Sequence, residues 1–171
     1  MTMHGTPDRG DDDPPGPFPG PRTLISAAGD LLAIAPVLVA ADDDLDTVIR
    51  RAAASPSTRV LGVVDPAGVL VGVVTPHDLV AAVVGRLAPG TLLTQIHDVD
   101  GVGEYGRYVE ARVAGDLMRP PAALPESATL GEAFDLMYLR DLSGAYVIDA
   151  AGRPTAYIDG LELAAAITAA G

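Results

Sequence analysis

One stretch of this sequence occurs twice, and the resulting internal repeat constrains the fold more than any other feature. Residues 63–68 read Val-Val-Asp-Pro-Ala-Gly, and residues 147–152 read Val-Ile-Asp-Ala-Ala-Gly, 84 positions later. The same offset carries residues 73–79 onto residues 157–163. A repeat of this length predicts two similar folded units, and a cleft between two such units is a natural ligand site.

The composition limits what the two units can contain and bind. The chain has 171 residues, of which 49% are hydrophobic and 4% aromatic, so we expect a sizeable core that is aliphatic. It has no Cys, which excludes disulfides, thiolate metal sites and a Cys nucleophile. The net charge of −12 disfavours nucleic-acid and anionic-membrane partners, because such partners require a basic surface.

No targeting or membrane segment is apparent in the sequence. The apolar runs are shorter than the roughly 18 residues that a membrane-spanning helix needs. The N-terminus lacks the basic start and apolar stretch of a signal peptide. Together with the absence of Cys, these features predict a cytoplasmic protein with no membrane partner.

Changes in composition divide the chain into four segments. The first is rich in Asp, Pro and Gly, cannot bury enough apolar surface to offset its ordering entropy, and is predicted to be a disordered tail. The linker between the repeats is long for a connector, so we expect either a short helix near residues 105–112 or a mobile lid. The segments are the tail (1–22), repeat 1 (23–87), the linker (88–112) and repeat 2 (113–171).

Each repeat is predicted to follow the order helix, strand, helix, strand, strand, helix. Asp65-Pro66-Ala67-Gly68 has Asp, Pro and Gly where a type I turn favours them, so it should join two strands into a hairpin. The flanking strands are rich in Val on both faces, which indicates burial on both sides. The strands are expected at residues 37–39, 60–64 and 69–74, then 122–124, 145–149 and 155–158; the longer helices are expected after residues 42–44, from residue 76, over 130–140 and over 160–169.

The tetrapeptide Thr75-Pro76-His77-Asp78 has the pattern of a helix start. Thr75 is an N-cap residue, Pro is favoured at the first helical position, and an Asp three residues after the cap completes a capping box. The bare N–H groups of such a helix end also favour an anion. The pattern is therefore compatible both with helix initiation alone and with a binding site.

The order of elements, the Asp-x-x-Gly turn and the Val-Val-Thr-x-x-Asp-Leu ending resemble the cystathionine-β-synthase (CBS) domain, and two in tandem resemble a Bateman module. The resemblance implies an α/β (α+β) fold of two β-α-β-β-α repeats related by pseudo-two-fold symmetry and packed through their sheets. It also implies a functional class, namely regulatory modules that often form homodimers and sense AMP, ADP, ATP or S-adenosylmethionine.

The resemblance also implies a ligand site. In the family the Asp that corresponds to Asp78 accepts hydrogen bonds from the two ribose hydroxyls, and the Thr at Thr75 binds the ribose or a phosphate. A carboxylate suits a cis-diol because its two oxygens accept from two adjacent donors. Family geometry would complete the pocket with Val113, Met118 and residues near Leu142–Ala145. Arg119, next to the strand, and His77, in the first turn of the helix, are candidate phosphate contacts by their position.

Several of these residues have an equally ordinary structural explanation. Met118 and Leu142 are either core residues or contacts for an adenine. Arg119 is either a solvated side chain or the first candidate for a phosphate ligand, followed by Arg107 and Arg112. His77 either donates to a phosphate or is simply exposed. His97-Asp98-x-Asp100 has no further ligands at a known spacing, so no metal site is predicted.

Repeat 2 departs from the pattern, because Asp159-Gly160-Leu161-Glu162 replaces the tetrapeptide. Asp159 still suits an N-cap. Its carboxylate, however, stands where the Thr hydroxyl would be and would repel a nearby phosphate by a few kcal/mol at an effective dielectric near 20. We therefore expect one competent nucleotide site, at Thr75 and Asp78, and one degenerate site.

These observations predict a regulatory sensor that binds an adenosine-type ligand, needs no cofactor, and acts on an unidentified partner protein in trans or through self-association. The alternative is a ligand-free scaffold in which both clefts are filled by side chains and the repeats serve to dimerise. Enzyme activity is not expected, since the sequence contains no nucleophile elbow, phosphate loop or zinc-protease motif.

Overall fold

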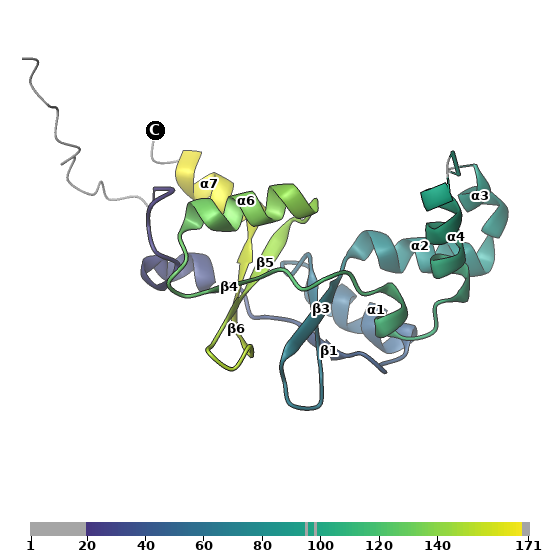
Figure 1. The fold of residues 1–171 in the computed structure, drawn as a ribbon, viewed down its shortest axis with the longest axis horizontal. Helices are drawn as coiled ribbons and strands as arrows, with labels where there is room; N and C mark the ends of the chain where they lie inside the picture. The colour runs from purple at the N-terminus through teal and green to yellow at the C-terminus, as the bar shows by residue number, and fades with distance from the viewer. Residues whose placement is uncertain (1–19, 95, 98, 169–171) are drawn as a thin grey trace, which may run out of the picture.

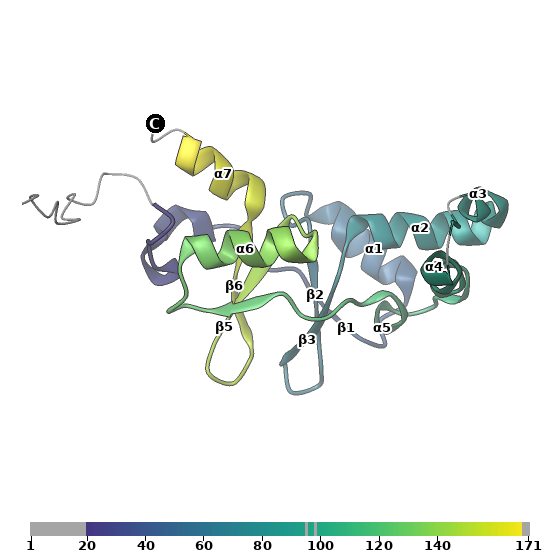
Figure 2. The same ribbon diagram turned by 45° about the horizontal axis from the view of Figure 1, so that its top comes forward.

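The computed structural model describes residues 20–94, 96–97 and 99–168. Nearly all of the predicted tail, residues 1–19, lies outside this range, as do residues 169–171. The described chain forms two three-stranded sheets that lie next to each other in the middle of the molecule, with the long helices of repeat 1 at one end and those of repeat 2 at the other (Figures 1 and 2). No described helix combines the length and apolar character needed to cross a membrane.

The two sheets have the same topology. In each, the first strand pairs in parallel with the second, and the second pairs antiparallel with the third. Both hairpins also shift register at matching positions, between Val63 and Val64 and between Val147 and Ile148. The strands are β1 (Leu38–Ala40), β2 (Leu61–Val64) and β3 (Leu70–Val74), then β4 (Ala123–Pro125), β5 (Gly144–Ile148) and β6 (Pro154–Asp159).

The repeated Asp-x-x-Gly motif forms both hairpin turns, as predicted. Asp65 Oδ1 accepts hydrogen bonds from the N–H groups of Ala67 and Val69, both at 2.9 Å. Asp149 accepts from the N–H groups of the corresponding residues in repeat 2. Gly68 has φ of 80° and Gly152 has φ of 77°, a left-handed conformation that glycine adopts without steric cost.

Helix starts also follow the sequence. Asp44 caps the first long helix by accepting from Thr47 N at 2.9 Å, as the acidic run predicted. Thr129 and Glu132 form a capping box in repeat 2. The long helices of the two repeats are α1 (Leu45–Ala54), α2 (Pro76–Leu87), α6 (Leu130–Arg140) and α7 (Gly160–Thr168).

Each repeat begins with a short helical segment that packs on the other repeat. The 3₁₀ segments η1 (Ile25–Ala27) and η2 (Gly29–Leu32) lie against the helices of repeat 2, where Ile25 is fully buried beside Leu130 and Leu163. Conversely, α5 (Ala114–Leu117) completes the core of repeat 1. The segment that opens each repeat therefore closes the core of its neighbour.

The linker is helical. It forms α3 (Pro89–Leu93) and α4 (Val99–Glu110), so the helical alternative is observed, although α4 begins earlier and ends before Arg112. Helix α4 packs closely on α2 at Gly85, where a Cβ atom would lie 3.2 Å from the backbone of Tyr108. The linker is thus packed against repeat 1.

The interface between the sheets corrects the expectation of an aliphatic core. Tyr146 and Tyr157 are fully buried there, with ring centroids 5.3 Å apart in an edge-to-face arrangement. The Tyr146 hydroxyl contacts the carbonyl oxygens of Val37 and Val60, at 2.9 and 2.8 Å. Because their hydroxyls find backbone partners in repeat 1, these two tyrosines can lie at the centre of the molecule.

Candidate functional site

The start of α2 has the local structure that the sequence predicted. Thr75 follows β3 directly, its Oγ1 accepts from Asp78 N at 3.2 Å, and Asp78 Oδ2 accepts from Thr75 N at 3.3 Å. The Thr75 hydroxyl also donates to Asp78 Oδ2 at 2.6 Å. This capping box fixes the Asp78 side chain at the edge between the two repeats.

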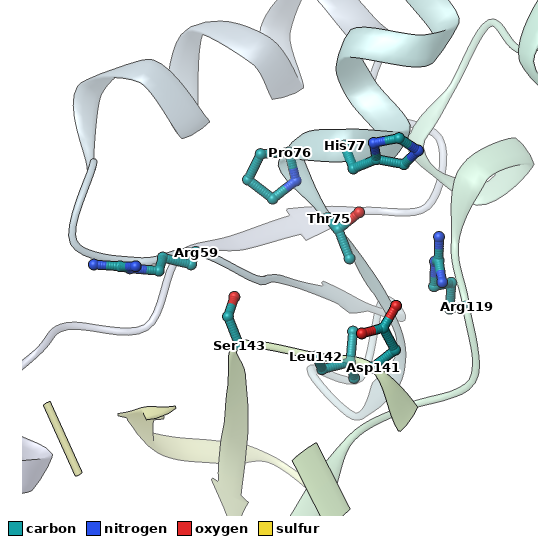
Figure 3. A pocket seen from close by; sticks show the side chains of 8 residues that line it. All are labelled: Arg59, Thr75, Pro76, His77, Arg119, Asp141, Leu142 and Ser143. Carbon is teal, nitrogen blue, oxygen red and sulfur yellow. The ribbon is translucent and has the colours of Figure 1, made fainter. Parts of the chain in front are cut away.

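A pocket of about 370 Å³ lies beside this helix start. Figure 3 shows that α2 contributes one wall, the segment before β5 another, and Arg119 a third. Four predicted ligand residues line it, namely Thr75, His77, Arg119 and Leu142. Pro76 and Ser143, which also line it, belong to the segments predicted to form the pocket, whereas Arg59 and Asp141 were not predicted.

A short backbone bridge between the repeats positions Arg119. Its N–H donates to Val73 O at 2.8 Å, and Val73 N donates to Arg119 O at 3.0 Å. The approach requires Gly72, because a Cβ there would lie 2.9 Å from both Arg119 O and Met118 Sδ. The backbone of Arg119 is therefore fixed, and its side chain extends into the pocket wall.

Asp78 is completely buried and receives six hydrogen bonds. Thr75 contributes two, and the Arg119 guanidinium contributes two, from Nε to Oδ2 and from Nη2 to Oδ1, both at 2.9 Å. Tyr108 donates to Oδ1 at 2.9 Å and Arg107 at 3.3 Å. A carboxylate offers about four acceptor sites, so all of them are occupied.

These contacts also decide the charge of Asp78. Burial raises the pKa of the carboxyl, but hydrogen bonds from Arg119, Thr75 and Tyr108 and the charge of Arg119 outweigh burial and lower its pKa below the ordinary value. Correspondingly, the hydrogen bonds that Arg119 donates to Asp78 raise the pKa of the Arg119 guanidinium. Asp78 is therefore an ionised, buried acceptor at neutral pH.

The linker helix α4 supplies two of these contacts. Burial, followed by the charge of Asp78, raises the pKa of the Tyr108 phenol, which therefore stays protonated and can donate. The Arg107 guanidinium contacts both Asp78 Oδ1 and the Tyr108 hydroxyl, the latter at 3.2 Å. The sequence suggested Arg107 only as a phosphate ligand and gave no signal for Tyr108, since no local pattern relates a linker residue to an acid 30 positions earlier.

Asp78 lies behind Thr75 and Arg119 and does not itself line the pocket, and four other candidate residues are not brought to it. Val113 is the N-cap of α5 and bridges to Asp44 at the start of α1. Ala145 is fully buried in β5 within the core of repeat 2. Met118 packs over Gly72 and is otherwise exposed, and Arg112 donates to the carbonyl oxygens that end α4.

The equivalent helix start in repeat 2 has different contacts. Asp159 caps α7 by accepting from the N–H groups of Leu161 and Glu162, as predicted. Its buried Oδ2 lies 3.2 Å from Arg59 Nε, a charge contact outside hydrogen-bond geometry. The Glu162 side chain, at the position equivalent to Asp78, is exposed. An arginine from repeat 1 therefore pairs with the buried acid at this second helix start.

The described residues contain no group of three or more His, Asp or Glu arranged to hold a metal ion. Asp98, in the His97-Asp98-x-Asp100 sequence, lies outside the described residues.

Comparison with known proteins places this geometry in a family. The family model for the CBS domain matches residues 28–85 and 114–168. No curated protein sequence matches the chain.

Solved structures share the fold at low sequence identity. A CBS domain-containing protein from Thermotoga maritima has a TM-score of 0.69 and 18% identity, over 86% of this chain and 96% of that one. CBSX2 in complex with AMP has a TM-score of 0.59 and 22% identity, over 86% and 97%; CBSX2 is from Arabidopsis thaliana. The CBS domain pair of protein MJ0100, in complex with 5′-methylthioadenosine and S-adenosyl-L-methionine, has a TM-score of 0.61 and 17% identity, over 87% and 98%.

At these identities the solved structures support the fold, and the family match identifies the units. The two matched segments coincide with the two sheets and their covering helices. The chain belongs to the CBS domain family and carries two copies of the domain in tandem.

Proposed function

We propose that this CBS pair is a regulatory module that binds one adenosine-type ligand in the pocket between Thr75 and Arg119. The observation that carries the proposal is the placement of a buried, ionised Asp78 at a helix start, directly behind the wall of a pocket between the repeats. A volume of about 370 Å³ falls within the range of small-molecule sites.

The chemistry of the pocket suits a nucleotide. Thr75 and Asp78 offer hydrogen-bonding groups for a ribose, and Leu142 offers an apolar contact. Arg119, Arg59 and His77 place positive or donor groups around the opening, which favours an anion there despite the acidic protein as a whole. Two neighbours of the same fold were solved with AMP and with 5′-methylthioadenosine and S-adenosyl-L-methionine.

Calorimetric titration with AMP, ADP, ATP and S-adenosylmethionine tests this proposal. We expect one ligand per chain, because Arg59 already pairs with Asp159, the acid at the start of the equivalent helix α7. Asp78→Asn should lower the affinity at least about tenfold, since the neutral amide cannot accept from two hydroxyls as a carboxylate does. Two equivalent ligands per chain would contradict a single site.

The alternative, a ligand-free scaffold, is supported by a specific observation. Asp78 already has all its acceptor sites filled by Thr75, Arg119, Tyr108 and Arg107, so the acid needs no ligand to be stable when buried. In this case no nucleotide would bind at millimolar concentration, while the pair would still associate with itself or with a partner.

Self-association is the second part of the proposal. Helices α2, α6 and α7 lie on the side of the sheets opposite the two hairpin turns (Figure 2). They carry exposed apolar residues, namely Val80, Tyr138, Leu139 and Leu161. We define these four residues as the apolar helix face and propose that a second copy of the chain covers it, with a regulated protein as a further partner in the cytoplasm.

A further inference from the structure

The Arg119 side chain occupies the two acceptors that a ribose would need. Its Nε and Nη2 donate to different oxygens of Asp78, each at 2.9 Å, in the forked geometry of a bidentate guanidinium–carboxylate pair. A ribose cis-diol presents two adjacent O–H donors and would use the same two oxygens. Arg119 and a ribose therefore compete for one set of hydrogen-bond acceptors.

We propose that nucleotide binding exchanges these partners, so that the ribose replaces Arg119 on Asp78 and Arg119 turns to a phosphate of the same ligand. This rests on the proposed function. The exchange would narrow the class of ligand, because the pocket would select phosphorylated ribonucleosides over adenosine, 5′-methylthioadenosine or S-adenosylmethionine.

The surroundings show which donor is displaced. Arg119 lines the pocket and its side chain is 29% exposed, whereas Tyr108 and Arg107 approach Asp78 from α4 and do not line the pocket. The backbone of Arg119 is fixed by its bridge to Val73, so only the side chain has to move. After the exchange, Thr75, Tyr108 and Arg107 would still compensate the charge of Asp78.

The displaced guanidinium explains the selectivity. Once Asp78 binds the ribose, Arg119 is a partly buried cation without its carboxylate, which is costly unless another anion replaces it. The other arginine of the pocket, Arg59, already contacts Asp159. A nucleotide phosphate supplies the new anion, a neutral nucleoside supplies none, and the sulfonium of S-adenosylmethionine would add a repulsive charge.

Binding of AMP and adenosine to the wild-type chain and to Arg119→Gln tests the exchange, because the expected effects have opposite signs. In the wild type AMP should bind at least about tenfold more tightly than adenosine. In Arg119→Gln adenosine should bind about tenfold more tightly than before, since its competitor is gone, and AMP about tenfold more weakly, since its phosphate partner is gone. Arg119→Lys should retain part of the preference for AMP.

Arg112→Gln is the matched control. It removes the same charge, but Arg112 does not line the pocket and contacts backbone carbonyls at the end of α4. Both affinities should therefore stay within about twofold of the wild type, the size expected for a distant charge that salt screens. Thermal unfolding of each variant checks that the fold is retained.

The outcomes separate the two proposals. If AMP binds to the wild type but Arg119→Gln weakens or leaves unchanged both ligands, or if adenosine binds as tightly as AMP, the exchange is overturned and the nucleotide site remains. If neither ligand binds to the wild type or to Arg119→Gln at millimolar concentration, the proposed function fails and the exchange with it. Binding of adenosine only to Arg119→Gln supports the exchange.

Discussion

Asp78 illustrates how a buried charge can be stable and still available for chemistry. Its carboxylate is fully buried, yet two arginines, a tyrosine and a threonine donate to it, so ionisation is favoured over neutralisation. The same saturation means that a ligand must displace one donor before it can bind. Whether Asp78 can bind a ligand therefore depends on which of its hydrogen-bond donors can be displaced.

The lowered pKa of Asp78 predicts a contribution to acid unfolding. The folded chain holds this carboxyl ionised at a pH where the unfolded chain, with an ordinary pKa near 3.8, begins to bind the proton. The contribution is thus complete above that value and is lost as the pH falls through the lower folded pKa. Urea unfolding between pH 5 and 2.5 should show a shallower decline in Asp78→Asn than in the wild type.

Some decline should remain in Asp78→Asn, because hydrogen bonds from backbone N–H groups also lower the pKa values of Asp44, Asp116 and Glu132. Identical slopes in the two proteins would show that Asp78 titrates normally in the folded state.

Tyr108→Phe tests the contact from the linker helix. The ring would still pack, but one hydrogen bond to a buried carboxylate would be lost, so the free energy of unfolding should fall by about 1–2 kcal/mol. Tyr105→Phe, one turn earlier on α4, is the control and should change stability by less than about 0.5 kcal/mol, measured by urea unfolding. Equal effects of the two substitutions would argue against a specific role of the Tyr108 hydroxyl.

At the scale of elements, the sequence predicted local structure well and long-range contacts poorly. The repeated Asp-x-x-Gly turns, the Thr75–Asp78 capping box and the acidic start of α1 were predicted, because each depends on residues within a few positions. The approach of α4 to Asp78 and the cover of Asp159 by Arg59 were missed, because both join elements whose spacing no local pattern records.

The central tyrosines were missed for a related reason. The amino-acid composition gives the number of aromatic residues but not their positions in the fold. Two of the five tyrosines, Tyr146 and Tyr157, lie at the contact between the sheets. For the candidate site, the tetrapeptide predicted the α2 wall of the pocket, the resemblance predicted Leu142, and the place of Arg119 beside a predicted strand made it a candidate. The pairing of Arg119 with Asp78 required coordinates.

Close packing between β3 and the segment before β4 makes Gly72 a sensitive position. In Gly72→Ala the new methyl group would meet Arg119 O and Met118 Sδ, so the strand bridge should be strained and stability should fall by about 1–3 kcal/mol. Gly103→Ala in α4 is the matched control: its Cβ would meet no atom within 4 Å, and helix propensity should add about 0.5–1 kcal/mol. Thermal unfolding measures both, and a neutral Gly72→Ala would contradict this reading of the bridge.

At the scale of the whole molecule, the side opposite the hairpins is the candidate contact surface. The apolar helix face is strongly exposed: Tyr138 is 88% and Leu139 is 80% exposed on α6, Val80 is 62% exposed on α2 and Leu161 is 58% exposed on α7. Exposed apolar residues gathered on one face are typical of association sites.

Leu139→Glu should therefore shift the chain toward the monomer in sedimentation-velocity experiments, because it would place a charge in a desolvated contact. Val102→Glu is the control, since Val102 is an exposed apolar residue on α4, outside the apolar helix face. A wild-type chain that is monomeric at high micromolar concentration, or equal effects of the two substitutions, would exclude this face as a dimer contact.

The crossed packing of η1 and α5 has a consequence for how the chain can be divided. A fragment that begins after the linker would leave the cavity of Ile25 open among Leu130 and Leu163, and a fragment that ends before α5 would expose the space filled by Leu117. Neither repeat alone contains all the residues of its hydrophobic core. A shortened or duplicated form of this protein would therefore have to keep both contacts, that of η1 with repeat 2 and that of α5 with repeat 1.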